Sequence, residues 1–227
     1  MRISIASFQE ILQHEMSMSQ QSYDEWWVAQ NAIRQDENIS VKGIKLFVRR
    51  DVFSPSPKLT YSSSFLIKNI PDVAGSRILD MGTGSGILAI YAILYGAKSV
   101  TAVDIDRHAL HNAQINIDKN CPNGKIILRQ SDLFKNVKGQ FNFIFANLPI
   151  CSRAWKGISN KGMMVLYDRL LAEYGFYLFD DGKLFLTFAS FGNMDWLLKQ
   201  MKKRKIIYRM QKARKFDTEW FVFELKK

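Results

Sequence analysis

Four polar side chains in this sequence lie at the ends of short apolar segments that are typical of buried strands. They are Asp80, Asp104, Asp132 and Asn147. Carboxylate oxygens accept hydrogen bonds from hydroxyl and amino groups, and an amide oxygen accepts from the N–H of a weak nucleophile. Because open α/β sheets bind ligands beyond the carboxyl ends of their strands, we expect these four side chains to share one crevice.

A glycine turn follows Asp80 directly, with Gly82, Gly84 and Gly86 at alternate positions before an apolar helix. Glycines permit positive φ and a close approach of backbone to ligand. The helix would point its free N–H groups and the positive end of its dipole at that ligand. Asp104 lies eighteen residues after Gly86, where a carboxylate can accept from both hydroxyls of a ribose. A nucleotide-like ligand is therefore expected.

The spacing of the turn distinguishes between two such ligands. A dinucleotide site prefers G-x-G-x-x-G, whereas this chain has G-x-G-x-G, with Ile87 where a third glycine would fall. The carboxylate of Asp80 would also repel a pyrophosphate, but it would suit a sulfonium or an amino group. We therefore predict S-adenosylmethionine as the cofactor and disfavour a nicotinamide oxidoreductase.

An acid followed by G-x-G-x-G resembles the first motif of the class I methyltransferases. The segment Ala146-Asn147-Leu148-Pro149-Ile150 resembles the Asn-Pro-Pro-aromatic motif of amino-group methyltransferases. These include the release-factor glutamine and ribosomal-RNA guanine N-methyltransferases of the small methyltransferase domain group. The resemblance covers about residues 52–190. It implies a cofactor site made of Asp80, Gly82, Thr83, Gly84, Gly86, Asp104, Ile105, Asp132, Leu133 and Asn147.

The resemblance also assigns roles in that site. Asp132 would accept from the exocyclic amine of adenine, although such a residue could equally cap a helix, and Ile105 would lie against the ring. A loop that carries Phe53, Pro55 and Thr60 would lie over the cofactor.

The resemblance implies that Asn147, Leu148 and Pro149 form the catalytic motif. An amide or base-amine nitrogen is a poor nucleophile because its lone pair is delocalised. Acceptors that hold its N–H groups localise the lone pair toward the methyl group. The Asn147 side-chain oxygen and the Leu148 carbonyl would be those acceptors, while Pro149 rigidifies the turn. The chain departs from the motif at Leu148, which replaces a proline, and at Ile150, which replaces the stacking aromatic; Trp155 could supply a ring or simply pack.

Strand-like and helix-like segments alternate through the rest of the chain. This pattern predicts an α/β fold, with a Rossmann-like, mainly parallel seven-stranded sheet, helices on both faces and an antiparallel C-terminal strand. Residues 1–52 are expected to form a mainly helical N-terminal appendage with one strand, and residues 53–227 the methyltransferase domain. The expected strands are 43–50, 77–80, 99–104, 125–130, 141–146, 183–188, 206–210 and 219–225, and the expected helices are 62–69, 86–94, 108–116, 164–178 and 194–203.

Composition points to a polyanionic partner. The net charge is +11 over 227 residues, which favours RNA or a ribonucleoprotein. A basic tail could bind its phosphates or be a solvated surface: Lys202, Lys203, Arg204, Lys205, Arg209, Lys212, Arg214 and Lys215. The two cysteines, without a Cys/His cluster, indicate reduced thiols and no zinc site. No signal peptide or membrane span is evident, and a cytoplasmic protein is expected.

The leading hypothesis is an S-adenosylmethionine-dependent N-methyltransferase that modifies an exocyclic base amine in RNA. A protein glutamine methyltransferase and a small-molecule methyltransferase remain alternatives with the same chemistry. A cofactor-binding fold that has lost catalysis is a fourth reading, because Leu148 and Ile150 depart from the motif.

Overall fold

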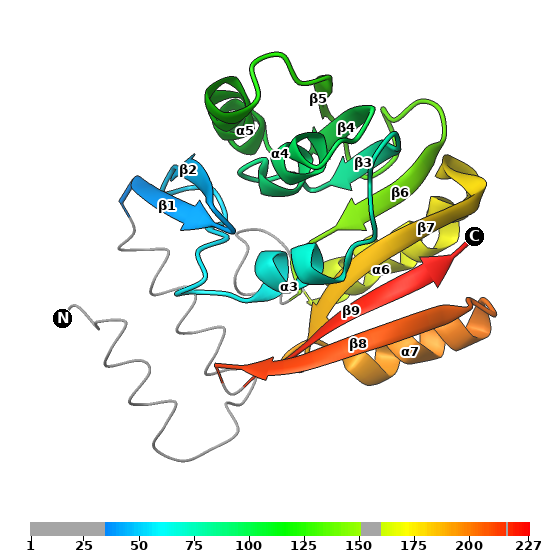
Figure 1. The fold of residues 1–227 in the computed structure, drawn as a ribbon. Helices are drawn as coiled ribbons and strands as arrows, with labels where there is room; N and C mark the ends of the chain where they lie inside the picture. Colours follow the sequence, from blue (N-terminus) through cyan, green and yellow to red (C-terminus); the bar gives the residue numbers. More distant parts are fainter. Residues whose placement is uncertain (1–34, 151–159, 217) are drawn as a thin grey trace.

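The computed structural model describes residues 35–150, 160–216 and 218–227 (Figure 1). The expected N-terminal helical segment therefore lies almost entirely outside the described residues, as does Trp155. The sequence predicts helix from residue 1 to about residue 38, and of the four positions in that range that are described, Glu37 and Asn38 belong to a strand and not to a helix, because they pair with the strand that follows.

A seven-stranded sheet forms the centre of the molecule, in the order β5-β4-β3-β6-β7-β9-β8. Its strands are β3 (Arg77–Met81), β4 (Ser99–Asp104), β5 (Ile126–Gln130), β6 (Phe141–Ala146), β7 (Leu178–Ala189), β8 (Tyr208–Lys215) and β9 (Thr218–Lys226). Neighbours from β5 to β7 are parallel, while β9 runs antiparallel to both β7 and β8. The predicted parallel sheet with an antiparallel C-terminal strand is confirmed.

Helices cover both faces of this sheet. They are α3 (Ser62–Asn69), α4 (Ile87–Leu94), α5 (Arg107–Asn120), α6 (Asn160–Glu173) and α7 (Met194–Lys203), with a 3-10 turn η1 (Tyr174–Tyr177) after α6. Apolar residues of α3, α4 and α5 belong to one buried cluster, and those of α6 and α7 to a second. Figure 1 shows the same division, with α6 and α7 on the far side of the sheet from α3. Each face therefore has its own core, as an α/β sheet requires.

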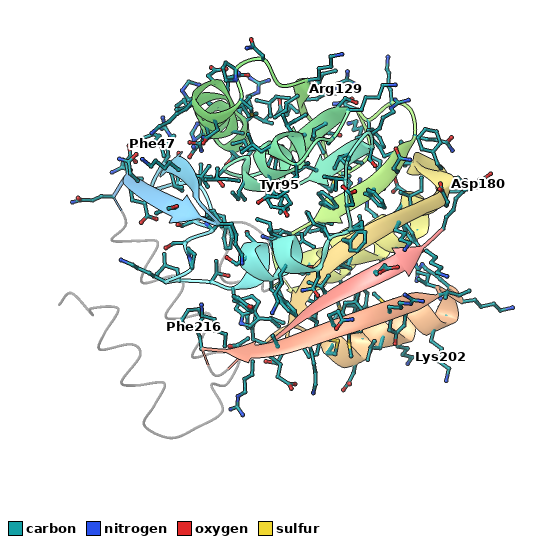
Figure 2. All side chains as sticks on the ribbon, in the orientation of Figure 1. Phe47, Tyr95, Arg129, Asp180, Lys202 and Phe216 are labelled. Atoms are coloured by element: carbon teal, nitrogen blue, oxygen red, sulfur yellow. The ribbon has the colours of Figure 1, made fainter. Side chains whose placement is uncertain are left out.

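A two-stranded hairpin, β1 (Glu37–Val41) and β2 (Ile44–Val48), packs beside α5. Two buried asparagines of that helix bind its backbone. Asn116 Oδ1 accepts from Phe47 N at 2.8 Å, and Asn112 Oδ1 accepts from Arg49 N at 2.8 Å. Figure 2 labels Phe47 at this junction. The hairpin leads into the loop before α3, and through Asn112 and Asn116 its backbone is held against the domain.

Several expected elements match the structure to the residue, among them α3, β4, β6 and α7. Others differ at their ends. The helix expected to continue to Leu178 stops at Glu173, and Leu178 instead begins β7 by pairing with Phe141. The domain boundary near residue 52 stays a prediction. Among the described residues, no helix is long and apolar enough to cross a membrane.

Candidate active site

A cavity of about 340 Å³ lies at the carboxyl edge of β3, β4 and β6. It is lined by Gly82 and Asn147, which follow β3 and β6, and by Asp104, which ends β4. Residues of the segment 51–63 complete the wall, among them Phe53 and Pro55. The crevice expected from the chain's alternating pattern is thus present, and the loop that carries Phe53, Pro55 and Thr60 borders it.

The glycine turn has the backbone that its sequence suggested. Gly82, Gly84 and Gly86 have φ of 73°, 54° and 83°, a region that other residues rarely adopt. A Cβ on Gly82 would come within 2.8 Å of the Leu148 side chain. The turn thus requires glycine at position 82, and a larger residue there would also displace the Leu148 side chain.

Asp80 lies buried behind this turn, with no surface exposed, and does not line the cavity. Its Oδ2 accepts from Thr83 Oγ1 at 2.7 Å and from Ala89 N at 3.2 Å. Within the described part of the chain, Oδ1 has no hydrogen-bond partner. Burial raises the pKa of this carboxyl to about 7, against the hydrogen bonds from Thr83 and Ala89. Asp80 therefore joins the turn to the first residues of α4.

Asp104 is the last residue of β4, and each of its two carboxylate oxygens accepts from a backbone N–H group. Oδ2 accepts from Gly84 N at 2.9 Å and Oδ1 from Asp106 N at 3.0 Å. Burial raises its pKa, while these two donors act in the opposite direction. Each oxygen keeps a second lone pair, so the carboxylate can still accept from a pair of hydroxyls. Ile105 lines the cavity beside it and is 64% exposed.

Asp132 has a partner that the sequence did not suggest. Arg169 of α6 donates from Nη1 to both carboxylate oxygens, at 3.0 and 2.9 Å. Both side chains are about 40% exposed, so the pair adds little stability. Asp132 still lines the cavity together with Leu133, whose φ of 47° lies in the left-handed region. The ion pair links α6 to the part of the site where adenine is expected.

The Asn147 side chain is held by two hydroxyl groups from distant segments. Thr187 of β7 donates to Asn147 Oδ1 at 2.6 Å, and Asn147 Nδ2 donates to Ser63 Oγ of α3 at 3.0 Å. Leu148, Pro149 and Asn147 all line the cavity. The motif therefore faces the same space as the glycine turn and Asp104.

A smaller cavity of about 110 Å³ adjoins Ile150, which lines both. Aromatic rings surround it, from Tyr167 of α6, Phe188 of β7 and Trp196 of α7. Aromatic surface is thus present next to the motif, although position 150 itself is aliphatic.

Most of the residues expected at the site line the large cavity, namely Gly82, Thr83, Gly84, Asp104, Ile105, Asp132, Leu133, Asn147, Leu148 and Pro149. Two do not: Asp80, which is behind the turn, and Gly86, which is the N-cap of α4. Their contacts with a cofactor stay predictions. No local signal could have found Ser63, Arg169 or Thr187, because each comes from an element distant in sequence.

Comparisons with known proteins identify the family and the fold of this chain. The model of the methyltransferase small domain family matches residues 43–216. A Methanocaldococcus jannaschii protein, described as a putative protein N5-glutamine methyltransferase, is 37% identical over 111 residues, covering 49% of this chain and 53% of that protein. A ribosomal protein L11 methyltransferase of Thermosipho melanesiensis is 46% identical over 74 residues, covering 33% of this chain and 28% of that protein. The chain thus spans about half or less of the curated relatives that it matches.

Two solved structures share the fold. The ribosomal protein L11 methylase of Lactobacillus delbrueckii subsp. bulgaricus has a TM-score of 0.57 at 24% identity, over 72% of this chain and 76% of that one. The 16S rRNA N2 G1207 methyltransferase of T. Thermophilus, in complex with AdoMet and guanosine, has a TM-score of 0.62 at 19% identity, over 85% of this chain and 50% of that one. With the family model matching most of its length, this chain belongs to the methyltransferase small domain family.

Proposed function

We propose that this protein is an S-adenosylmethionine-dependent N-methyltransferase that modifies an exocyclic base amine in RNA. One observation carries the proposal. A single cavity is bordered by the glycine turn and Asp104 as well as by the Asn147 motif. A cofactor that occupies the first part would bring its methyl group toward the second.

The residues of the cavity fit S-adenosylmethionine. Gly82 and Gly84 keep their side of the wall free of side chains. The oxygens of Asp104 have lone pairs left for the two ribose hydroxyls. The exposed Ile105 offers an apolar face for adenine, and Asp132, which also lines the cavity, is assigned the role of accepting from the adenine amine. A cavity of about 340 Å³ is also of the size that small-molecule ligands occupy.

The cofactor supplies an electrophilic methyl group on a sulfonium. The acceptor nitrogen must present a localised lone pair, and the chain provides two acceptors for its N–H groups. We assign these roles to Asn147 Oδ1 and the Leu148 carbonyl. Orientation by such fixed acceptors lowers the barrier without a strong base. The nitrogen–carbon bond would form as the methyl–sulfur bond of the sulfonium breaks, leaving a neutral thioether, and the nitrogen would then give up its proton to water.

RNA is the acceptor class that the charge of the molecule favours. The net charge is +11, and exposed cations lie along α7 and β8. A protein glutamine is the second candidate, because the Methanocaldococcus jannaschii relative is described as a putative protein N5-glutamine methyltransferase. In RNA and in protein glutamine alike, the nitrogen to be methylated carries two N–H groups, which the same two hydrogen-bond acceptors would hold.

Calorimetric titration tests the cofactor site. We expect micromolar binding of S-adenosylmethionine and no response to NAD. Asp104→Ala should abolish binding because the ribose hydroxyls lose their acceptor, while Asp118→Ala, at an exposed position of α5, should bind normally. Near-normal affinity of Asp104→Ala would refute its ribose role.

Transfer of a labelled methyl group tests the chemistry and the acceptor. RNA and protein fractions from cells that lack this protein are incubated with the chain and labelled S-adenosylmethionine. We expect label in RNA, removed by ribonuclease, and label in protein alone would establish the second candidate. Asn147→Ala should bind the cofactor but lose transfer by about 100-fold or more. Unchanged turnover would show that the motif is not the catalytic one.

A further inference from the structure

Three elements meet at the side-chain amide of Asn147. Asn147 follows β6, and Ala146 pairs with Leu186 in the neighbouring strand β7. The next residue of β7, Thr187, therefore lies beside Asn147. Ser63 reaches the same amide from the first turn of α3. Both hydroxyl residues are 1% exposed.

The Asn147 amide has its oxygen toward Thr187 and its nitrogen toward Ser63, and the lengths of the two hydrogen bonds fit this orientation. The contact with Thr187 is 2.6 Å and the contact with Ser63 is 3.0 Å. Bonds of O–H···O type are commonly 2.7–2.8 Å, and N–H···O bonds about 2.9–3.0 Å. The oxygen thus faces Thr187 and the nitrogen faces Ser63. A reversed amide would need an N–H···O bond of 2.6 Å, below the usual range.

The two hydroxyl groups also differ in their access to the cavity. Ser63 lines it, whereas Thr187 does not. The Thr187 hydroxyl has one other acceptor nearby, the Ala146 carbonyl, at a longer 3.4 Å. Its proton is therefore directed to Asn147 from outside the cavity. Asn147 Oδ1 keeps its second lone pair, and the amide plane is fixed before an acceptor molecule arrives.

We propose that Thr187 is a positioning residue for methyl transfer. Its hydroxyl, with Ser63 at the other end of the amide, holds Asn147 so that Oδ1 presents its second lone pair to the N–H of the methyl acceptor. This inference rests on the catalytic role proposed for Asn147. A free asparagine amide rotates and exposes either end, so an amide that is held in advance avoids that loss of orientation.

Two substitutions at one position test the proposal. Thr187→Val keeps the shape of the side chain and removes the hydroxyl, and Thr187→Ser restores the hydroxyl. Thr101→Val, in β4 and away from the cavity, controls for replacing a strand threonine. Single-turnover transfer is measured from labelled S-adenosylmethionine to the RNA or protein fraction that the unsubstituted chain methylates. Thermal unfolding confirms that each variant is folded.

We expect Thr187→Val to slow single-turnover transfer by about 10- to 100-fold. The dissociation constant for S-adenosylmethionine, measured by calorimetry, should stay within about twofold because Thr187 lies outside the cavity. Thr187→Ser and Thr101→Val should transfer at nearly the original rate. If Thr187 had only a structural role, Thr187→Val would lower the unfolding temperature. It would not slow transfer while leaving the affinity for S-adenosylmethionine unchanged.

A second readout does not depend on the acceptor. The side-chain amide protons of Asn147 are followed by nitrogen-15 NMR, and we expect their exchange with water to be slow in the unsubstituted chain and in Thr187→Ser. In Thr187→Val it should be at least about tenfold faster.

The outcomes separate this inference from the proposed function. Original transfer rates in Thr187→Val, or an equally protected amide, overturn the positioning role even if Asn147→Ala is inactive. Normal transfer by Asn147→Ala overturns the catalytic role proposed for Asn147 and the positioning role with it, while the absence of all transfer in the unsubstituted chain would overturn the proposed function.

Discussion

At the scale of single residues, Asp80, which lies buried behind the glycine turn, makes the stability of the folded chain depend on pH. Burial raises its pKa to about 7 in the folded chain, from an ordinary value of 3.8. Between about pH 4 and 7 the folded carboxyl therefore holds a proton that the unfolded chain has released. The stability that this proton brings is fully present below about pH 4 and is lost as the pH rises to about 7.

We expect Asp80→Asn to remove this part of the pH dependence, since the amide does not ionise. Across that window, the difference in free energy of unfolding between the two chains should change by up to about 4 kcal/mol. Urea unfolding at a series of pH values measures it. Asp72→Asn, at an exposed position, gives the baseline for replacing a carboxyl. A difference that does not vary with pH would mean that Asp80 is ionised throughout.

The residues of the site differ in whether the sequence around them could reveal their role. Gly82, Gly84 and Asp104 were predictable because their types and spacing specify a turn and an acid at known positions of one βαβ unit. Thr187 and Arg169 were not, since nothing near either residue distinguishes it from an ordinary strand threonine or helix arginine. Only the pairing of β6 with β7, and the packing of α6, bring them to Asn147 and Asp132.

At the scale of elements, Asn116 of α5 connects the β1–β2 hairpin to the glycine turn. It is fully buried and binds three backbone groups. Its Oδ1 accepts from Phe47 N, and its Nδ2 donates to Phe47 O at 2.8 Å and to Ser85 O at 2.9 Å. The side chain of Asn116 therefore holds both the hairpin and the glycine turn.

We expect Asn116→Ala to lower the free energy of unfolding by about 3 kcal/mol, because buried backbone groups lose their partner. Gln114→Ala, at an exposed position of the same helix, should change it by less than about 0.5 kcal/mol. Urea unfolding of both variants provides the comparison. Equal stabilities would show that Phe47 and Ser85 find other partners.

The helices and strands also differ in how well their ends could be predicted from the sequence. Helix α3 and strands β4 and β6 were predicted to the residue because their apolar periodicity and flanking breakers agree. The end of α6 was not, because its apolar pattern continues through the 3-10 turn into β7. There the pairing of Leu178 with Phe141 ends the helical segment, and such pairing across 37 positions leaves no local signal.

At the scale of the whole molecule, six of the eight cations of the basic tail form two groups, and of the other two Arg204 pairs with Asp168. Those nearer the cavity have intramolecular partners: Lys215 lies over the rings of Tyr61 and Phe216, and Lys212 pairs with Glu219. Near the other end of β8, Lys202, Lys203, Lys205 and Arg209 are exposed, and their side chains show no ion pair among the described residues. Figure 2 labels Lys202 and Phe216 toward opposite ends of β8.

We call Lys202, Lys203, Lys205 and Arg209 the distal cations. This arrangement predicts that they contribute to the affinity only for an RNA that is long enough to reach them. The strand β8 has eight residues and spans about 27 Å, so an RNA must extend at least that far from the cavity to reach them. We expect replacement of Lys202, Lys203, Lys205 and Arg209 by Gln to weaken binding of an RNA of roughly 20 nucleotides. The slope of log affinity against log salt should fall in magnitude by up to about 3 for a single strand.

Fluorescence anisotropy over a salt series measures this slope. A matched variant replaces Lys42, Lys45, Lys119 and Lys125 by Gln, which changes the net charge equally at exposed positions of the hairpin and the α5 region. If the distal cations contact RNA, only the first variant loses affinity, and a nucleoside or dinucleotide acceptor is methylated equally by both. Equal losses would mean that net charge alone attracts RNA. No loss in either variant would favour the second class of methyl acceptor, a protein amide, over RNA.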